Sequence, residues 1–268
     1  MSTPGVELRK LVTYLDAFLR IREIPDHANA LNGLQVENSG TISRIVAAVD
    51  ASQATFDGLV IPGASGATAG PTLLLVHHGM FWDGNQPVIG RRYRRLRSLL
   101  AQDAALYAAH IPLDLHPEVG NNVVLARELG LTDLTPFGTH KGVDIGLAGM
   151  APAELTTRTA LVCRLASLLR ISPDNIRVIA GGGESVGRIG VITGGGGSTI
   201  AQARAAGCDA YITGEGAAHT YFDAMEAGLN VFYAGHYATE TVGVRALADH
   251  LGERFGLPWE FHNHPTGM

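Results

Sequence analysis

Short apolar runs alternate with amphipathic segments along most of the chain. Residues 6–21 carry apolar positions at helical spacing, whereas the runs at 45–50 and 72–79 are apolar almost throughout, which is typical of strands buried on both faces. A helical pattern follows at 91–103, and a third apolar run covers 104–114. Strands that alternate with helices predict βαβ units, a mainly parallel sheet and therefore an α/β fold.

The second half of the chain repeats this alternation after a helical pattern at 152–170. Strands are expected at 176–180, 188–193, 209–216 and 230–240, and helical patterns lie between or after most of them. The repeated order of elements indicates a second α/β segment of about the same size as the first.

Two of the expected strands resemble each other in detail. ALYAAHIPLD and VFYAGHYATE both place a histidine after two small residues and a carboxylate four positions later, so that His110 and Asp114 correspond to His236 and Glu240. We interpret this as an internal duplication that gives two related α/β lobes, residues 1–125 and 126–268, with a metal site in the cleft between them. One composite domain is the alternative.

Composition narrows the class of protein. The 268 residues are 46% hydrophobic and 17% charged, which is the balance of a soluble globular protein. The net charge of −5 argues against a generally basic nucleic-acid-binding surface. Neither a membrane span nor a secretory signal is visible, and the two cysteines suggest no disulfide framework. We therefore expect a cytoplasmic protein without a membrane partner.

Metal-ligand side chains lie where the expected strands end. His77 and His78 end one apolar run, Asp114 lies just beyond another, and His236 precedes Glu240 by one helical turn. In an open parallel sheet, ligands bind beyond the carboxyl ends of the strands. Imidazole and carboxylate suit zinc, iron or manganese, and the absence of cysteine from the set disfavours a structural zinc site.

Two divalent ions fit these residues better than one. Adjacent side chains of a strand point in different directions, so His77 and His78 coordinate most easily if they serve neighbouring ions. A carboxylate at Glu240 reaches the ion held by His236, or bridges both. A pair of ions lowers the pKa of a bridging water, and hydrolysis is the natural chemistry of such a centre.

An ordered series of motifs resembles one known family over nearly the whole chain. The motifs are LNGLQVEN (31–38), VHHGMFWDG (76–84), HIPLDLHPEVGNN (110–122), TGGGGSTI (193–200), YITGEGAAH (211–219) and GHYATETVGVRAL (235–247). They resemble the GTP cyclohydrolase 1 type 2 homologue family, also described as Ngg1-interacting-factor-like.

The resemblance implies His77, His78, Asp114, His236 and Glu240 as the ligands of a dinuclear metal centre. It further implies two α/β lobes and a toroidal homohexamer, in a compact form without the domain that some members insert between the lobes. The family's name implies hydrolytic opening of GTP. The resemblance does not include His110 among the ligands.

Other residues near the expected strand ends are candidates for further roles. Glu215 and His219 are candidates for proton transfer or for orienting a ligand, against surface or capping roles. His110 and Asn32 are candidates for substrate binding, against a buried histidine and a simple turn. The glycine-rich segment 193–199 could cradle a phosphate, although close packing of a strand and a helix explains it as well.

These observations favour a hydrolase with two metal ions that acts on a nucleotide or phosphorylated small molecule. The alternative is a non-catalytic protein that binds or delivers metal, or a ring-shaped scaffold that binds nucleic acid. The basic segment 91–97, with five arginines in seven residues, is the feature that would bind nucleic acid. A solvated face or a subunit contact explains the same segment.

Overall fold

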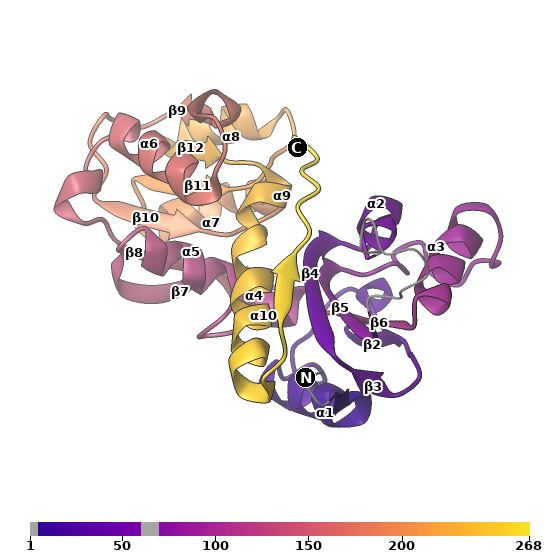
Figure 1. The fold of residues 1–268 in the computed structure, drawn as a ribbon. Helices are drawn as coiled ribbons and strands as arrows, with labels where there is room; N and C mark the ends of the chain where they lie inside the picture. Colours follow the sequence, from indigo (N-terminus) through magenta and orange to yellow (C-terminus); the bar gives the residue numbers. More distant parts are fainter. Residues whose placement is uncertain (1–4, 60–69) are drawn as a thin grey trace. The chain divides into compact units, whose positions relative to one another are not determined.

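The computed structural model describes residues 5–59 and 70–268, which fall into two compact units (Figure 1). Unit 1 runs as far as Leu113 and also includes Val244–His264, whereas unit 2 comprises Asp114–Gly243 and Pro265–Met268. The C-terminal part of the chain therefore returns to unit 1. The lobe ranges 1–125 and 126–268, and their origin by duplication, stay predictions.

Unit 1 is built around a five-stranded sheet. Its order is β13-β4-β5-β6-β2, in which the first four strands are parallel and β2 pairs with β6 in the antiparallel direction. The elements of this unit are β1 (Val6–Glu7), α1 (Leu8–Phe18), the 3-10 helix η1 (Ala28–Ala30), β2 (Gly33–Val36), β3 (Thr41–Ile42), β4 (Arg44–Asp50), α2 (Gln53–Asp57), β5 (Thr72–His78), α3 (Gly90–Ala101), β6 (Ala104–Ala108) and β13 (Trp259–Phe261), while α4 (Ile111–Asp114) and α10 (Thr241–Phe255) each cross from one unit to the other along the chain.

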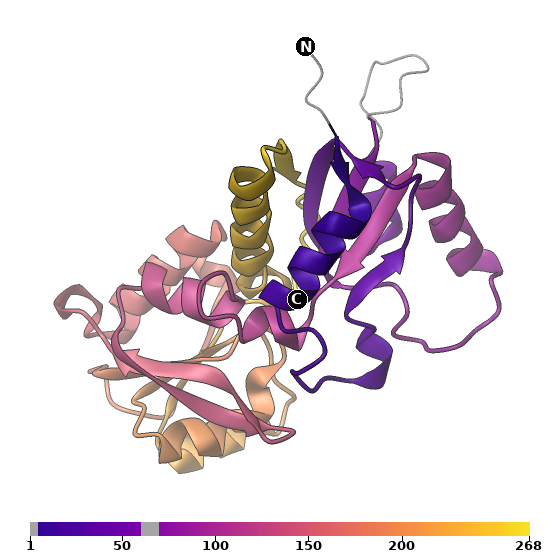
Figure 2. The same ribbon diagram turned by 90° about the horizontal axis from the view of Figure 1, so that it is seen from below.

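Helices cover both faces of this sheet because alternate strand residues point to opposite sides (Figures 1 and 2). On one face, Leu74 and Leu106 pack with Phe56 of α2 and Leu99 of α3. On the other face, the Tyr107 hydroxyl donates a hydrogen bond to Asp16 of α1, at 2.8 Å. The rings of Phe18 in α1 and His250 in α10 stack at 4.3 Å, which joins these two helices.

Unit 2 holds a six-stranded mixed sheet. Its order is β7-β8-β10-β11-β12-β9, with β10, β11 and β12 parallel and the remaining pairings antiparallel. Its elements are α5 (Asn121–Glu128), β7 (Thr132–His140), β8 (Val143–Met150), η2 (Ala153–Leu155), α6 (Arg158–Leu169), η3 (Pro173–Asn175), β9 (Arg177–Ala180), β10 (Arg188–Val191), η4 (Gly196–Thr199), α7 (Ile200–Ala205), β11 (Ala210–Thr213), α8 (Thr220–Ala227), β12 (Asn230–Tyr233) and α9 (His236–Thr239).

Two buried clusters lie on the two faces of the unit 2 sheet. Phe232 of β12 packs with residues of α5 and α6, such as Leu125 and Leu165. On the opposite face, Tyr211 of β11 packs with residues of α7 and α8, such as Ala224. Like unit 1, this unit is therefore a helix–sheet–helix sandwich, which confirms the α/β fold class expected from the sequence.

Several local expectations differ from the structure. The strands expected at 104–114 and 230–240 end at Ala108 and Tyr233, because each chain segment then turns into a short helix, α4 or α9. The antiparallel edge strands were not expected either. The β7–β8 hairpin turns through Lys141 and Gly142, both with positive φ, and such turns match the twist of the paired strands.

Within the described residues, no helix has both the length and the apolar character that crossing a membrane requires.

The packing predicts a large stability difference between a buried and an exposed apolar residue. Phe232 is fully buried, so Phe232→Ala should lower the free energy of unfolding by about 3–5 kcal/mol through lost burial and a cavity. Leu100 on α3 is 64% exposed, so Leu100→Ala should change the free energy of unfolding by less than about 0.5 kcal/mol. Guanidinium unfolding followed by circular dichroism measures both, and equal losses would contradict the described core.

Candidate metal centre

The candidate residues of unit 1 lie at the carboxyl ends of its parallel strands. Strand β4 ends at Asp50 and strand β5 ends with His77 and His78, while His110 follows β6 by two residues. Parallel strands end at one edge of a sheet, so residues separated by up to 60 positions in the sequence come together there.

The adjacent histidines of β5 are held by different acceptors. His77 is fully buried, and its Nδ1 donates to the carbonyl oxygen of Ala109, at 2.9 Å. The Nδ1 of His78 donates to Oδ1 of Asp50, also at 2.9 Å. The two ring centroids are 4.7 Å apart. Both rings therefore have fixed orientations before any ligand arrives.

His110 is oriented by residues of the loop that follows α1. Its Nδ1 donates to Oδ1 of Asp26, at 3.0 Å, and its backbone amide donates to Oδ1 of Asn32, at 2.7 Å. Asn32 in turn donates to Oδ2 of Asp26, at 2.8 Å. Burial raises the pKa of Asp26, but the hydrogen bond and charge of His110 outweigh it, so the pKa lies below its usual range and the carboxyl is ionised.

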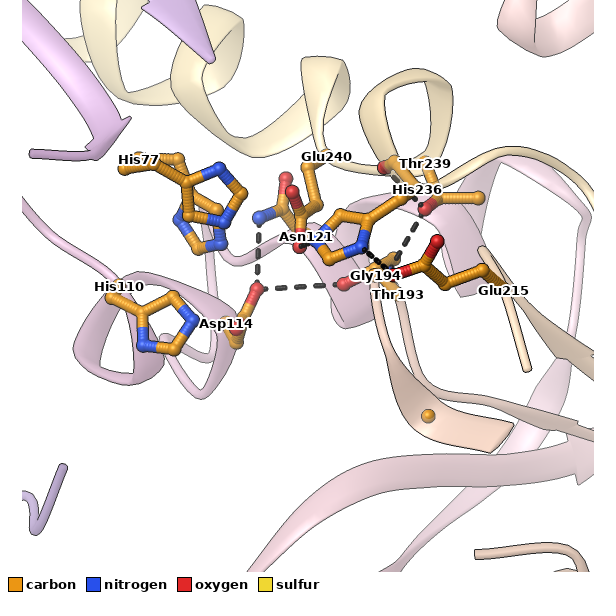
Figure 3. Close-up of polar contacts among 12 residues, drawn as sticks. His77, His110, Asp114, Asn121, Thr193, Gly194, Glu215, His236, Thr239 and Glu240 are labelled. Carbon is orange, nitrogen blue, oxygen red and sulfur yellow. Dashed lines mark hydrogen bonds and ion pairs between the residues drawn. The ribbon is translucent and has the colours of Figure 1, made fainter. Parts of the chain in front are cut away.

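These three histidines form a cluster within unit 1. One possible ligand atom from each of His77, His78 and His110 lies within 4.8 Å of the others (Figure 3 labels His77 and His110). Neutral imidazole is a common ligand of zinc, iron and other transition metals. The cluster is therefore chemically suited to hold a metal ion.

In unit 2, His236 opens α9 just beyond the end of β12, between two carboxylates. Its Nδ1 donates to Oε1 of Glu215, at 2.8 Å, and its Nε2 donates to Oε1 of Glu240, at 3.1 Å. Burial lowers the pKa of His236, but these two carboxylates outweigh it and raise the pKa to about 9. The surroundings of this ring therefore favour positive charge, which a divalent cation supplies as well as a proton does.

Asp114 is fixed in unit 2 by neutral donors. Its Oδ1 accepts from Nδ2 of Asn121, at 2.8 Å, and from the hydroxyl of Thr193, at 3.4 Å (Figure 3). Asn121 is itself fully buried, and its Oδ1 accepts from the backbone amide of Gly243, at 2.7 Å. These contacts hold the carboxylate without neutralising it.

The first glycine of the glycine-rich segment provides space for the site. A Cβ at Gly194 would lie 2.1 Å from Oε1 of Glu240, and the residue has φ +69°. The amide of Gly194 donates to the hydroxyl of Thr239, at 3.0 Å (Figure 3). At Gly197 a Cβ would lie 2.5 Å from Cα of Gly216. Close packing therefore accounts for these two glycines.

Two cavities in unit 2 lie beside these candidate residues. One of about 430 Å³ is lined by the glycine-rich segment and by Ser198, Glu215 and His219. The other, about 330 Å³, has Asp114 and His116 in its wall, together with apolar residues of the β7–β8 hairpin such as Leu134. The first cavity is mostly bordered by exposed polar residues and glycine, and the second is mostly apolar.

The structure brings together residues that the sequence analysis chose and others that it missed. Within unit 1, His110 lies beside His77 and His78, and Asn32 supports the backbone of His110 and lines neither of the two cavities. Within unit 2, His236, Glu240 and Glu215 form one hydrogen-bonded group. His219 immediately precedes α8 and lines the larger cavity.

The missed residues are those that orient the candidate ligands: Asp26, Asp50, Asn121 and Thr193. Asp50 had a visible signal, because it ends an apolar run in the same way as His78. No sequence pattern pointed to Asp26 or Asn121, because each orients a candidate ligand through a contact that forms only in the folded chain.

The basic segment 91–97 lies on α3 and is only partly available to a ligand. Arg92 is engaged by the Asp83 carboxylate and by the carbonyl oxygens of Gly84 and Gln86. Arg95 is partly buried, and burial lowers its pKa. Three of the five arginines are exposed, so the segment offers fewer free charges than its sequence suggests.

Comparisons with known proteins find similarity over nearly the full chain. Residues 6–266 match the model of a family described as Duf34/NIF3 (NGG1p interacting factor 3). A protein of Deinococcus radiodurans called GTP cyclohydrolase 1 type 2 homolog is 46% identical over 261 residues, which cover 97% of this chain and 94% of that protein. A Halobacterium salinarum protein with the same name is 44% identical over 93% of this chain and 95% of its own length.

A solved structure is similar as well. The crystal structure of a Thermus thermophilus protein, 42% identical in sequence, superposes with a TM-score of 0.84 over 98% of this chain and 100% of that chain.

Neighbouring glycines provide a matched test of the space beside Glu240. Gly194→Ala should destabilise the protein by at least about 1–2 kcal/mol, because it places a Cβ against Glu240 and forces alanine to a positive φ. Gly195 has φ −86°, and its Cβ would meet the nearest atom, Cε1 of His236, at 3.7 Å. Gly195→Ala should therefore melt like the wild type, and a Gly194→Ala protein that does so would contradict the described geometry.

Proposed function

Because this chain belongs to the Duf34/NIF3 family, we propose that it is a metal-dependent hydrolase with a dinuclear centre that acts on a nucleotide or phosphorylated small molecule. The protein would hold two divalent ions per chain, with zinc, iron and manganese all compatible with the donor set. The relatives' name, GTP cyclohydrolase 1 type 2 homolog, makes GTP the first nucleotide to test.

The proposed ligands are His77 and His78 of unit 1 with Asp114, His236 and Glu240 of unit 2. The proposal depends on the hydrogen bonds that hold these side chains within each unit. His77 and His78 have their Nδ1 atoms engaged, and the Nδ1 atom of His236 is held by Glu215. Side chains held in this way are prepared to bind a cation with little loss of conformational entropy.

Two divalent ions held by these residues would supply Lewis acidity for attack at an electrophilic carbon or phosphorus. The chain's own residues supply orientation and proton transfer. Glu215 accepts from His236 and lines the larger cavity of unit 2, and His219 lines the same cavity. We propose these two residues as the groups that move a proton at the substrate.

The larger cavity also supports a phosphorylated substrate. Its wall includes Gly195 and Ser198, which are both exposed, and the Ser198 side chain is a hydroxyl donor. His219 adds an exposed imidazole to the same wall. A phosphoryl group seated there would lie beside Glu215, the partner of His236.

We also propose that the chain assembles as a toroidal homohexamer. Helix α8 supports self-association, because Tyr221, Phe222 and Met225 all expose large parts of their apolar side chains to solvent. Light scattering at micromolar concentration should give six times the mass of one chain. The mass of a single chain would contradict this assembly.

Metal content and turnover test the central proposal together. Protein purified without a tag should carry two ions per chain, and it should hydrolyse a member of a nucleotide panel led by GTP. Removing the metal with a chelator should abolish turnover, and adding metal back should restore it. Glu240→Gln should lower turnover at least about 100-fold, since metal assistance is worth several kcal/mol.

Glu128→Gln is the matched control, because Glu128 is an exposed residue of α5 outside the site. It should keep both the metal and the turnover of the wild type. Two ions without turnover of any nucleotide would favour the metal-binding or metal-delivery alternative. A protein that neither holds nor takes up metal would overturn the proposal.

A further inference from the structure

We propose that neighbouring copies of this chain are joined by two different helices, α3 of unit 1 from one copy and α8 of unit 2 from the next (Figure 1 labels both helices). The inference rests on the homohexamer proposed above and names the surfaces that hold it together. It is independent of the metal centre. It arises from two exposed apolar patches that carry charges of opposite sign.

Large apolar side chains that face solvent are concentrated on these two helices. Among the described residues, ten such side chains are exposed, and six of them lie in two short segments: Val88, Ile89 and Tyr93 at the N-terminal end of α3, and Tyr221, Phe222 and Met225 on α8. The most exposed member of each segment is Ile89, at 72%, and Phe222, at 63%. Clustered apolar side chains on a surface mark a site of interaction, whereas single ones do not.

The two helices differ in the sign of their charges. Arg94 and Arg97 are exposed on α3, which has no acidic residue, and Asp223 and Glu226 are exposed on α8, which has no basic residue. Within the part of the chain that the structure describes, none of these four side chains forms an ion pair. Their charges are therefore available to a partner of opposite sign.

Apolar and charged positions have the same spacing on both helices. Tyr93 is followed by an arginine one and four positions later, and Phe222 is followed by a carboxylate one and four positions later. Residues four apart are neighbours on a helix surface, so each aromatic ring has charged groups along the same flank. Because both helices are right-handed, antiparallel packing of the two aromatic faces places the arginines and the carboxylates on one side of the pair.

Charge favours α3 against α8 over either helix against its own copy. Two α3 helices would bring arginines together, two α8 helices would bring carboxylates together, and like charges across an interface cost several kcal/mol. A nucleic acid would neutralise α3 but leave the acidic and apolar face of α8 uncovered. A second copy of this chain is the partner that matches both helices.

The proposed contact also explains how a ring can form. It joins two different surfaces, so each copy offers α3 to one neighbour and α8 to the other. Head-to-tail contacts of this kind build a closed ring when their rotation closes. The contact therefore agrees with the proposed toroid.

Charge reversal on each helix of the full-length protein tests the contact. Arg94→Glu with Arg97→Glu, and separately Asp223→Arg with Glu226→Arg, should each raise the concentration needed for assembly at least about tenfold, as measured by light scattering. An equimolar mixture of the two variants should assemble again. In that mixture, the acidic α3 of one variant meets the basic α8 of the other, and the unchanged helices also have opposite charges.

Two matched controls separate this contact from general effects of charge and apolar surface. Arg9→Glu with Lys10→Glu changes the net charge by the same amount on exposed positions of α1 and should assemble like the wild type. Phe222→Ala should weaken assembly. Leu100→Ala should not, because Leu100 lies about 10 Å along α3 from Tyr93, and the whole of α8 is only about 12 Å long.

The outcomes distinguish the interface from the assembly itself. A hexameric wild type whose charge-reversed variants both stay hexameric would overturn the inference and leave the proposed homohexamer intact. Variants that dissociate but do not assemble on mixing would overturn it as well, because the two helices would then not face each other. Loss of binding to a single-stranded oligonucleotide in an Arg94→Glu, Arg97→Glu hexamer would assign α3 to nucleic acid instead. A monomeric wild type would overturn both the interface and the homohexamer.

Discussion

The hydrogen bond from the Nδ1 atom of a histidine to a fixed acceptor is the interaction on which the candidate site depends. A carbonyl oxygen holds His77, Asp50 holds His78 and Asp26 holds His110. Each bond selects one tautomer and one ring orientation, and it does so in the absence of a ligand. Without these acceptors, the imidazoles would lose rotational entropy when a metal bound.

The fold explains why such acceptors are available. Within each unit, the parallel strands end at one edge of that unit's sheet. The short helices or turns after these strands carry polar side chains. In unit 2, the approach of Glu240 to Gly194 requires a residue without a side chain, while Thr239 fixes the backbone of the same glycine. Backbone packing and ligand position are therefore coupled: a methyl group at residue 194 would displace a carboxylate.

The sequence predicted the parts of this arrangement that depend on local pattern. The buried runs ending at Asp50 and His78 formed parallel strands, as their continuous apolar character indicates. The strand expected through Asp114 ended early, because Pro112 has no backbone N–H for a strand ladder and fits the first turn of a helix. The β7–β8 hairpin is local, and the sequence signal for it is the turn through Lys141 and Gly142. The pairing of β13 with β4 depends on a contact between distant segments, so no local sequence pattern predicts it. For the same reason, the sequence showed histidines and carboxylates as candidate ligands but did not show that Asp26, 84 positions away, orients His110.

The most direct measurement of the central claim is anomalous X-ray diffraction from crystals of the protein, recorded at the absorption edge of the metal it carries. The account predicts two anomalous peaks per chain, with His77 and His78 coordinating through Nε2 and with their Nδ1 atoms still bonded to Ala109 and Asp50. Coordination through Nδ1, or crystals of metal-loaded protein without a peak at these histidines, would contradict it.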